Sequence, residues 1–208
     1  MGLMDQASLV NDLKSMLKEA VKKFSNDDSD YIRLIDFALS DISRVRPYRK
    51  TGAITLIAEV GEYPLPADLY KLDFPLWGNA ERRTRKPWNT NYPGPAPVAH
   101  VFGGGASKML YLSPAPTSAQ IINLGDQYKF YYRGLHVVNA AAENTTVDSA
   151  DRDLLLIRAT AQAMNEMAAD GVTKPIKLGG SGVGAMPKNG TPAALAESLM
   201  NLFTSMSA

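Results

Sequence analysis

The sequence predicts an α+β fold, in which a helical bundle core carries a β-rich insertion and a C-terminal extension that ends in a helix. Three observations predict this class. Apolar residues recur at steps of three and four near both ends of the chain, the middle is rich in strand-forming residues, and a glycine-rich stretch precedes the last apolar stripe. Because an amphipathic helix cannot bury its apolar stripe alone, we expect the helices at both ends to close a single core.

Two helices are expected before the β-rich part. The first carries an apolar stripe formed by Leu9, Leu13, Met16, Leu17, Ala20, Val21 and Phe24. The short oxygen-bearing side chains of residues 25–29 then provide N-cap groups for a second helix. Its stripe consists of Tyr31, Ile35, Ala38, Ile42 and Val45. Pro47 ends this helix because proline cannot continue the hydrogen-bond ladder.

The middle of the chain has the composition of strands and turns. Residues 53–60 are β-rich, and residues 63–72 lead into another extended segment. Residues 98–102 and 109–112 flank three consecutive glycines, and this spacing predicts a β-hairpin. Residues 127–133 alternate in polarity, as a strand with one buried face does.

A third helix is expected to begin near Val147, where acidic residues favour a helix N-terminus. Its stripe consists of Leu154, Ile157, Ala161, Met164 and Ala168, and Asp170-Gly171 is its expected stop. Residues 171–191 hold six glycines and two prolines, which predict a flexible or extended linker. Thr191-Pro192 then offers an N-cap and a first turn for a last helix.

The apolar stripe of the last helix has two alternative destinations. It consists of Leu195, Leu199, Leu202, Phe203 and Met206. An amphipathic helix packs by default on the core of its own chain. A helix reached through a glycine-rich linker can equally extend outward and enter a groove on another protein.

The order of these segments predicts four parts. They are an N-terminal helical pair of the core (1–51), a β-rich insertion (52–135), a third core helix (136–170), and a glycine-rich linker with a C-terminal helix for partner docking (171–208).

Composition narrows the classes of protein that the chain can belong to. Hydrophobic residues make up 45% and charged residues 21%, as in ordinary globular proteins, and no run approaches the roughly 18 apolar residues of a membrane-spanning helix. The N-terminus has no basic region followed by an apolar one, so we expect the chain to stay in the cytoplasm where it is made. The absence of cysteine excludes disulfides and thiolate chemistry. A net charge of +1 favours no particular partner.

The residue patterns predict no catalytic site, no metal site and no cofactor. His100 and His136 do not stand in a metal-ligand or triad setting, and the acidic clusters at the starts of the second and third helices are best explained as helix caps. The glycines at 103–105 and 179–184 lack the Gly-Lys-Ser/Thr ending of a phosphate loop and the strand-to-helix context of a dinucleotide site. We therefore do not expect an enzyme.

Two basic clusters are candidate contact sites. They comprise Arg44, Arg46 and Arg49 at the end of the second helix, and Arg82, Arg83, Arg85 and Lys86 in a proline-rich segment, residues 77–97, that is expected to be a long loop or a hairpin arm. Clustered arginines beside an aromatic residue suit phosphate contact, whereas the simpler interpretation is a solvated helix end and a solvated loop. In an oligomer, either cluster could instead meet acidic residues of a neighbour.

Several stretches together resemble the head-to-tail adaptor (connector) proteins in the neck of tailed bacteriophages. They are Asp30-Tyr31-Ile32-Arg33-Leu34-Ile35 with Asp41-Ile42 and Arg46-Pro47, then Glu62-Tyr63-Pro64-Leu65-Pro66-Ala67-Asp68-Leu69, and finally Tyr131-Tyr132-Arg133 before Asp153-Leu154-Leu155-Leu156. The resemblance spans residues 5–170.

This resemblance implies a structural role without catalysis. Such proteins are virion components that form homo-oligomeric rings, commonly of twelve copies, and the ring lumen conducts DNA. For this chain it implies that residues 191–208 dock on the portal protein and that the insertion meets the next neck or tail protein. It implies a protein made in the host cytoplasm, with no membrane partner.

Three alternatives stay open at this point. The chain could be another neck component, such as a stopper or a tail terminator. It could also be a nucleic-acid-binding protein that acts through its two arginine clusters, with a salt-sensitive affinity. A small enzyme is disfavoured because no nucleophile and base form a recognisable pair.

Overall fold

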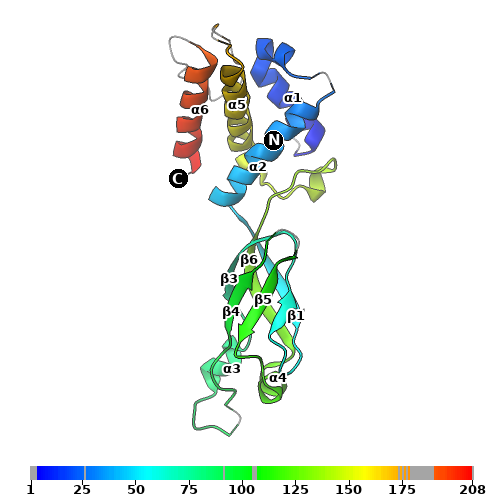
Figure 1. Cartoon of the computed structure of the whole chain (residues 1–208), viewed down its shortest axis with the longest axis vertical. Coiled ribbons are helices and arrows are strands. Elements are labelled where there is room, and N and C mark those ends of the chain that lie inside the picture. The colour runs from blue at the N-terminus through cyan, green and yellow to red at the C-terminus, as the bar shows by residue number, and fades with distance from the viewer. Residues whose placement is uncertain are drawn as a thin grey trace. The chain divides into compact units, whose positions relative to one another are not determined.

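The computed structural model describes residues 4–25, 27–90, 92–104, 107–172, 174, 176, 178 and 190–207, apart from the side chains of Glu19, Arg82 and Arg83. The chain divides into two compact units (Figure 1). Met1–Tyr48 and His136–Ala208 form the helical unit, and Arg49–Leu135 form the β unit. The predicted α+β class is confirmed, because the first unit is helical and the second contains antiparallel sheets. The predicted insertion, residues 52–135, falls inside the β unit.

The helical unit is built around one central helix. Its elements are α1 (Gln6–Leu17), the 3-10 helix η1 (Lys18–Lys23), α2 (Ser29–Val45), the short η3 (Ala142–Asn144) and η4 (Ser149–Asp151), α5 (Arg152–Ala169) and α6 (Pro192–Ser207). Helix α5 packs against α1, α2 and α6 (Figure 1). Twelve of its residues are buried, around most of its circumference, as expected for a helix enclosed by neighbours on several sides.

The first predicted helix is divided in two. Helix α1 begins after Asp5, whose side chain accepts a hydrogen bond of 2.8 Å from the Ser8 amide, and it ends at Leu17. Lys18 has a positive φ of 47°, so the α-helix cannot continue, and a 3-10 helix follows. The apolar stripe was nevertheless predicted correctly, because Val21 and Phe24 still pack against the core.

Helix α2 ends at Val45, as Pro47 predicts, but Val45 does not belong to its buried face. The side chain of Val45 is 40% exposed, whereas the other four residues of the predicted stripe are buried. A bidentate ion pair joins α2 to α5, in which Arg33 Nη1 and Nη2 donate to the two carboxylate oxygens of Glu166 at 2.7 and 2.8 Å.

The β unit consists of two three-stranded sheets that pack face to face. One sheet has the order β1 (Tyr48–Thr55), β6 (Gln127–Gly134), β3 (Leu69–Pro75), and the other has the order β2 (Glu62–Pro64), β5 (Met109–Ser113), β4 (Val98–Phe102). Strands β4 and β5 form the predicted hairpin, with Val98 opposite Ser113 and Phe102 opposite Met109. Both sheets supply the core, which contains Leu56, Tyr63, Leu65, Leu69, Trp77, Leu110, Leu112, Tyr128, Phe130 and Tyr132.

The ring of Phe130 lies directly on the backbone of β1 at Gly52. A Cβ atom added to Gly52 would lie 2.4 Å from Phe130 Cζ, closer than any ordinary contact. Glycine is therefore required there by space, although its backbone angles are ordinary.

Two predictions for the insertion were wrong in detail, and one helix was not predicted. Strand β1 ends at Thr55, and residues 57–60 form a turn, because the Tyr63 hydroxyl makes hydrogen bonds to the backbone of Ile57 and Val60. The segment 77–97, expected to be loop, contains the short helix α3 (Asn79–Thr84). Helix α4 (Ser118–Leu124) was not predicted, although its capping box is present in the sequence as Thr117 and Gln120.

We predict that Gly52→Ala destabilises the β unit by about 1–3 kcal/mol, because the added methyl group would displace the Phe130 ring. Urea unfolding followed by tryptophan fluorescence measures this, since both tryptophans lie in the β unit and Trp77 is buried. Gly104→Ala is the control, because its new Cβ would meet no atom within 4 Å. A further change, Phe130→Leu, should recover part of the loss; equal stability of Gly52→Ala and wild type would contradict this packing.

The ion pair between α2 and α5 predicts a pH dependence. Hydrogen bonds from Arg33 hold the pKa of Glu166 below its usual range. A folded-state pKa that is lowered gives stabilisation that is complete above the pKa of the unfolded chain, roughly 4.3, and that is lost as the pH falls through the folded-state pKa. The thermal stability advantage of wild type over Glu166→Gln should thus shrink below about pH 4.3. Because Arg33 is half exposed, we expect about 0.2–1 kcal/mol at neutral pH.

The matched control for this pH experiment is the same substitution in an Arg33→Gln background. There the difference between Glu and Gln at position 166 should be small at every pH, because the partner that lowers the pKa is absent. An equally large difference in both backgrounds would show that Glu166 acts without Arg33.

Candidate interaction surfaces

The described residues offer no catalytic constellation. No group of three or more His, Asp or Glu residues among them could hold a metal ion, and no described helix is long and apolar enough to cross a membrane. His100 lies on β4 opposite Tyr111. His136 makes hydrogen bonds to the backbone of its own unit, with its Nε2 2.7 Å from the Arg46 carbonyl oxygen. The Nδ1 atom of His136 lies 3.2 Å from the Thr146 hydroxyl, which also accepts a hydrogen bond from the Val137 amide, so this contact belongs to the local backbone network.

The acidic clusters have local structural roles, in line with the capping interpretation at several positions. Asp148 accepts a hydrogen bond from the Ala150 amide at the start of η4. Asp27 accepts hydrogen bonds from the hydroxyls of Ser25 and Ser29. Asp28, the N-cap of α2, makes no capping bond and instead forms an ion pair with Lys14.

Two residues of the first basic cluster, Arg44 and Arg46, are engaged in contacts within the chain. Arg44 forms an ion pair with Asp41 at 3.2 Å. Arg46 forms an ion pair with Asp151 and donates to the Met206 carbonyl oxygen at 2.8 Å, so it joins the end of α2 to the end of α6. Arg49 lies on β1 in the β unit, where it lines a hollow of about 390 Å³ with Phe74, Tyr131 and other residues of the β1-β6-β3 sheet.

The second basic cluster belongs to one end of the β unit. Helices α3 and α4 lie at this end, away from the end where the chain enters and leaves the unit (Figure 1). Arg85, after α3, donates to the carbonyl oxygen and the side-chain oxygen of Asn123 in α4, at 3.1 and 3.2 Å. Lys86 is exposed. Arg82 and Arg83 lie in α3, but their side chains are outside the described set.

Two large apolar side chains are also exposed at this end. Trp88, in the loop after α3, is 81% exposed, and Ile122, on α4, is 83% exposed. We call Arg85, Lys86, Trp88, Tyr92 and Ile122 the tip surface. Exposed aromatic residues beside arginine are typical of contact surfaces between proteins.

The apolar stripe of α6 is mostly buried in the helical unit. Leu195, Leu199 and Phe203 belong to its core, and Leu202 packs against that core. Met206 is 41% exposed. In this structure the last helix therefore takes the first of its two predicted destinations, and Met206 is the member of the stripe that is most accessible to a partner. The glycines at 179–184, predicted to be linker, lie outside the described residues.

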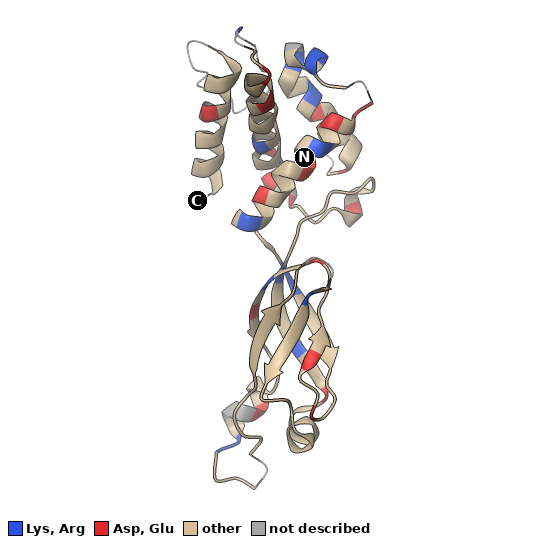
Figure 2. Ribbon diagram, in the orientation of Figure 1, with Lys and Arg blue, Asp and Glu red and all other residues tan. Residues whose placement is uncertain are grey.

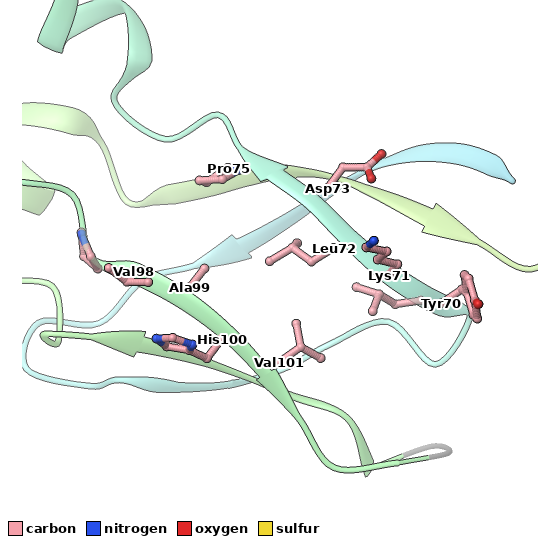
Figure 3. A pocket seen from close by; sticks show the side chains of 11 residues that line it. Tyr70, Lys71, Leu72, Asp73, Pro75, Val98, Ala99, His100 and Val101 are labelled. Atoms are coloured by element: carbon pink, nitrogen blue, oxygen red, sulfur yellow. The ribbon is translucent and has the colours of Figure 1, made fainter. Parts of the chain in front are cut away.

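A hollow of about 630 Å³ separates the edge strands β3 and β4. Leu72 of β3 and Ala99 and Val101 of β4 point into it, and Lys71 and His100 also line it (Figure 3). Sequence analysis did not identify this hollow, because it depends on which strands become the sheet edges.

Charge is divided unequally between the units (Figure 2). The β unit has ten Lys and Arg residues against six Asp and Glu residues, whereas the helical unit has twelve against fifteen. Any attraction to phosphate is therefore expected mainly of the β unit.

Comparison with known proteins identifies the family of this chain. No curated protein matches the sequence. The model of a family described as SU10 adaptor protein matches residues 4–175, which include most of the helical unit and the whole β unit but not α6. The resemblance to phage adaptors that the sequence suggested is thereby confirmed. The chain belongs to the SU10 adaptor protein family of phage head-to-tail adaptors.

Proposed function

We propose that copies of this chain form a ring, with twelve copies as the expected number, that joins the portal to the next neck or tail component and surrounds the path of the DNA. The observation that carries this proposal is the family match over residues 4–175, because the family is one of structural phage adaptors. The protein is then a component of the virion neck that acts without catalysis or cofactor. Synthesis in the host cytoplasm follows from the same role.

The portal contact is assigned to α6. Three residues of its apolar stripe fill the core, so they could reach a portal only if the helix left its place. Met206 and the partly buried Leu202 lie near the end of the helix, and Arg46 fixes that end through the Met206 carbonyl oxygen. A helix end that is held in place loses little conformational freedom on binding. We therefore assign the first portal contact to Met206 and Leu202.

The contact with the next neck or tail component is assigned to the tip surface. Trp88 and Ile122 are exposed there beside Arg85 and Lys86, and the bond from Arg85 to Asn123 joins the loop to α4. Such a surface suits the next neck or tail component. Basic residues of the β unit, including Arg49 and Lys86, are also the candidates for facing DNA in the lumen, because Arg44 and Arg46 are paired within the chain.

We predict that Met206→Glu in the full chain weakens binding to portal rings at least about tenfold, because it places a charge in an apolar contact. Light scattering of the protein alone and mixed with portal rings measures the complex. Thermal unfolding should be unchanged, since Met206 is exposed. Ala193→Glu is the matched control: it adds the same charge at an exposed position in the first turn of α6.

A chain that ends at Thr191 gives a second measurement. It should lose portal binding, and it should also lose stability, because Leu195, Leu199 and Phe203 no longer fill the core. Undiminished binding of this shortened chain would exclude α6 as the portal contact. A protein that stays monomeric with and without portal rings would overturn the connector proposal, and salt-dependent binding of that monomer to DNA would favour a nucleic-acid-binding protein.

We predict that the double change Trp88→Ala and Ile122→Ala leaves ring formation and portal binding intact but abolishes joining to the next neck or tail component. The reason is that exposed aromatic and aliphatic anchors contribute most of the affinity of such contacts. To measure joining, complexes of portal and adaptor are mixed with the next neck or tail component, and the fraction of joined particles is counted by electron microscopy. Val137→Ala, an exposed apolar residue of the helical unit, is the control; normal joining by the double variant would contradict the assignment.

A further inference from the structure

The turn between β1 and β2 is held by several hydrogen bonds and exposes two apolar side chains. Ile57 is 61% exposed and Val60 37% exposed. Glu59, between them, has a positive φ of 63°, a conformation that non-glycine residues rarely adopt. The turn is held in this shape by the Tyr63 hydroxyl, which lies 3.0 Å from the Ile57 amide and 2.9 Å from the Val60 carbonyl oxygen. The Glu59 amide also donates to the Pro116 carbonyl oxygen at 2.9 Å.

Ile57 and Val60 stay exposed although hydrogen bonds hold the backbone of this turn. Unusual backbone angles persist where surrounding contacts enforce them, and they are frequent where a segment must present side chains in one conformation. A loop that is already ordered loses little entropy on binding, which favours affinity. We call residues 57–62 the projecting turn.

The hollow between β3 and β4 has the properties of a receiving site. Its volume of about 630 Å³ lies in the range of sites that enclose a small ligand or several side chains. Leu72, Ala99 and Val101 provide apolar contacts inside it (Figure 3). Strand β4 pairs with β5 in regular register and contains neither proline nor lysine. Strand β3, by contrast, is interrupted by two register shifts and ends at Pro75.

Proteins usually protect an open, regular and apolar sheet edge such as β4 against pairing with a strand of another molecule. Here β3 carries such protective features and β4 does not. This difference indicates that β4 is covered in the assembled state.

The charges of the two features are complementary. The projecting turn carries Glu59 and Glu62, and no basic residue occurs between residues 51 and 70. The hollow is lined by Lys71, which forms no ion pair with a described residue, and by His100. Its one carboxylate, Asp73, accepts a bond of 2.7 Å from Arg133 and is thereby neutralised. The hollow therefore suits an acidic apolar segment.

The sheet topology places the two features at opposite edges. In each sheet the central strand separates the edge that adjoins the projecting turn, β1 or β2, from the edge that lines the hollow, β3 or β4. A contact between unlike surfaces on opposite sides of one subunit can repeat from copy to copy and close into a ring. A contact between like surfaces would stop at a dimer.

We infer that the projecting turn of one copy docks in the β3–β4 hollow of the next copy, with Ile57 and Val60 inside and Glu59 near Lys71. This inference rests on the proposed ring. It goes beyond the ring itself in naming the two halves of the contact between subunits.

Cysteine cross-linking tests the contact directly, because the chain has no cysteine of its own. Ile57→Cys and Val101→Cys, made in separate full-length chains and mixed in the presence of portal rings, should give a disulfide-linked pair under mild oxidation. Both changes in one chain should give a ladder of linked copies. Ile122→Cys with Val101→Cys is the matched control, since Ile122 is also exposed and apolar but belongs to the tip surface. Absence of a disulfide between positions 57 and 101 in assembled rings would overturn the inference.

A charge exchange provides the second measurement. Glu59→Lys should raise the protein concentration needed for ring formation at least about tenfold, and adding Lys71→Glu should restore it. Urea unfolding followed by Trp77 fluorescence checks that the β unit stays folded. Rings that form normally in all these variants would sink the inference and leave the proposed function standing. Failure of wild type to assemble with or without portal rings would overturn both.

Discussion

The fold depends on the point where the β insertion leaves and rejoins the helical unit. The His136 amide donates to the Ser43 hydroxyl at 2.9 Å, and its Nε2–H donates to the Arg46 carbonyl oxygen at 2.7 Å. The Nδ1 atom lies 3.1 Å from the Thr146 carbonyl oxygen and 3.2 Å from the Thr146 hydroxyl. The His136 ring also lies 5.8 Å from that of Tyr48. These bonds hold the two ends of the insertion together, so the entropy of closing a long loop is offset locally.

Because the two ends of the insertion are held together, the chain that follows the insertion rejoins the helical unit. There α5 packs against α1 and α2, the helices that precede the insertion. Arg152 and Arg158 on α5 are buried, and each pairs with a carboxylate of an earlier helix, Asp12 of α1 and Asp41 of α2. An arginine that is buried without its carboxylate carries a desolvation penalty, so these pairs disfavour other registers of α5. Helix α5 is then covered by α1, α2 and α6, so the exposed sides of these outer helices, and not α5, are available to partners of the helical unit.

Sequence reasoning succeeded where local periodicity decides the structure. Most residues of the stripes of α2, α5 and α6, the β4–β5 hairpin and the alternation of β6 follow from spacing, although Val45 and Met206 are exposed and Ala168 is only partly buried. It failed where distant contacts decide. Residues 57–60 have strand-forming composition, but hydrogen bonds to the Tyr63 hydroxyl and the Pro116 carbonyl oxygen hold them in a turn. The hollow beside β4 likewise exists only because β3 and β4 become sheet edges. The basic clusters were visible in the sequence, whereas the pairing of Arg46 with Asp151 and Met206 was not.

The pairing of Arg46 with Asp151 and with the Met206 carbonyl oxygen limits how the chain could contact DNA. If Arg46 turned toward a phosphate, it would release both Asp151 and the Met206 carbonyl oxygen, and the end of α6 would lose its attachment to α2. The same end carries the residues assigned to the portal contact, so one arginine cannot serve both purposes at once. Arg49 and Lys86 are exposed and lie in the unit with the excess of basic residues. In the proposed ring, passage of DNA requires weak, exchangeable phosphate contacts, which exposed side chains of this kind provide without disturbing the fold.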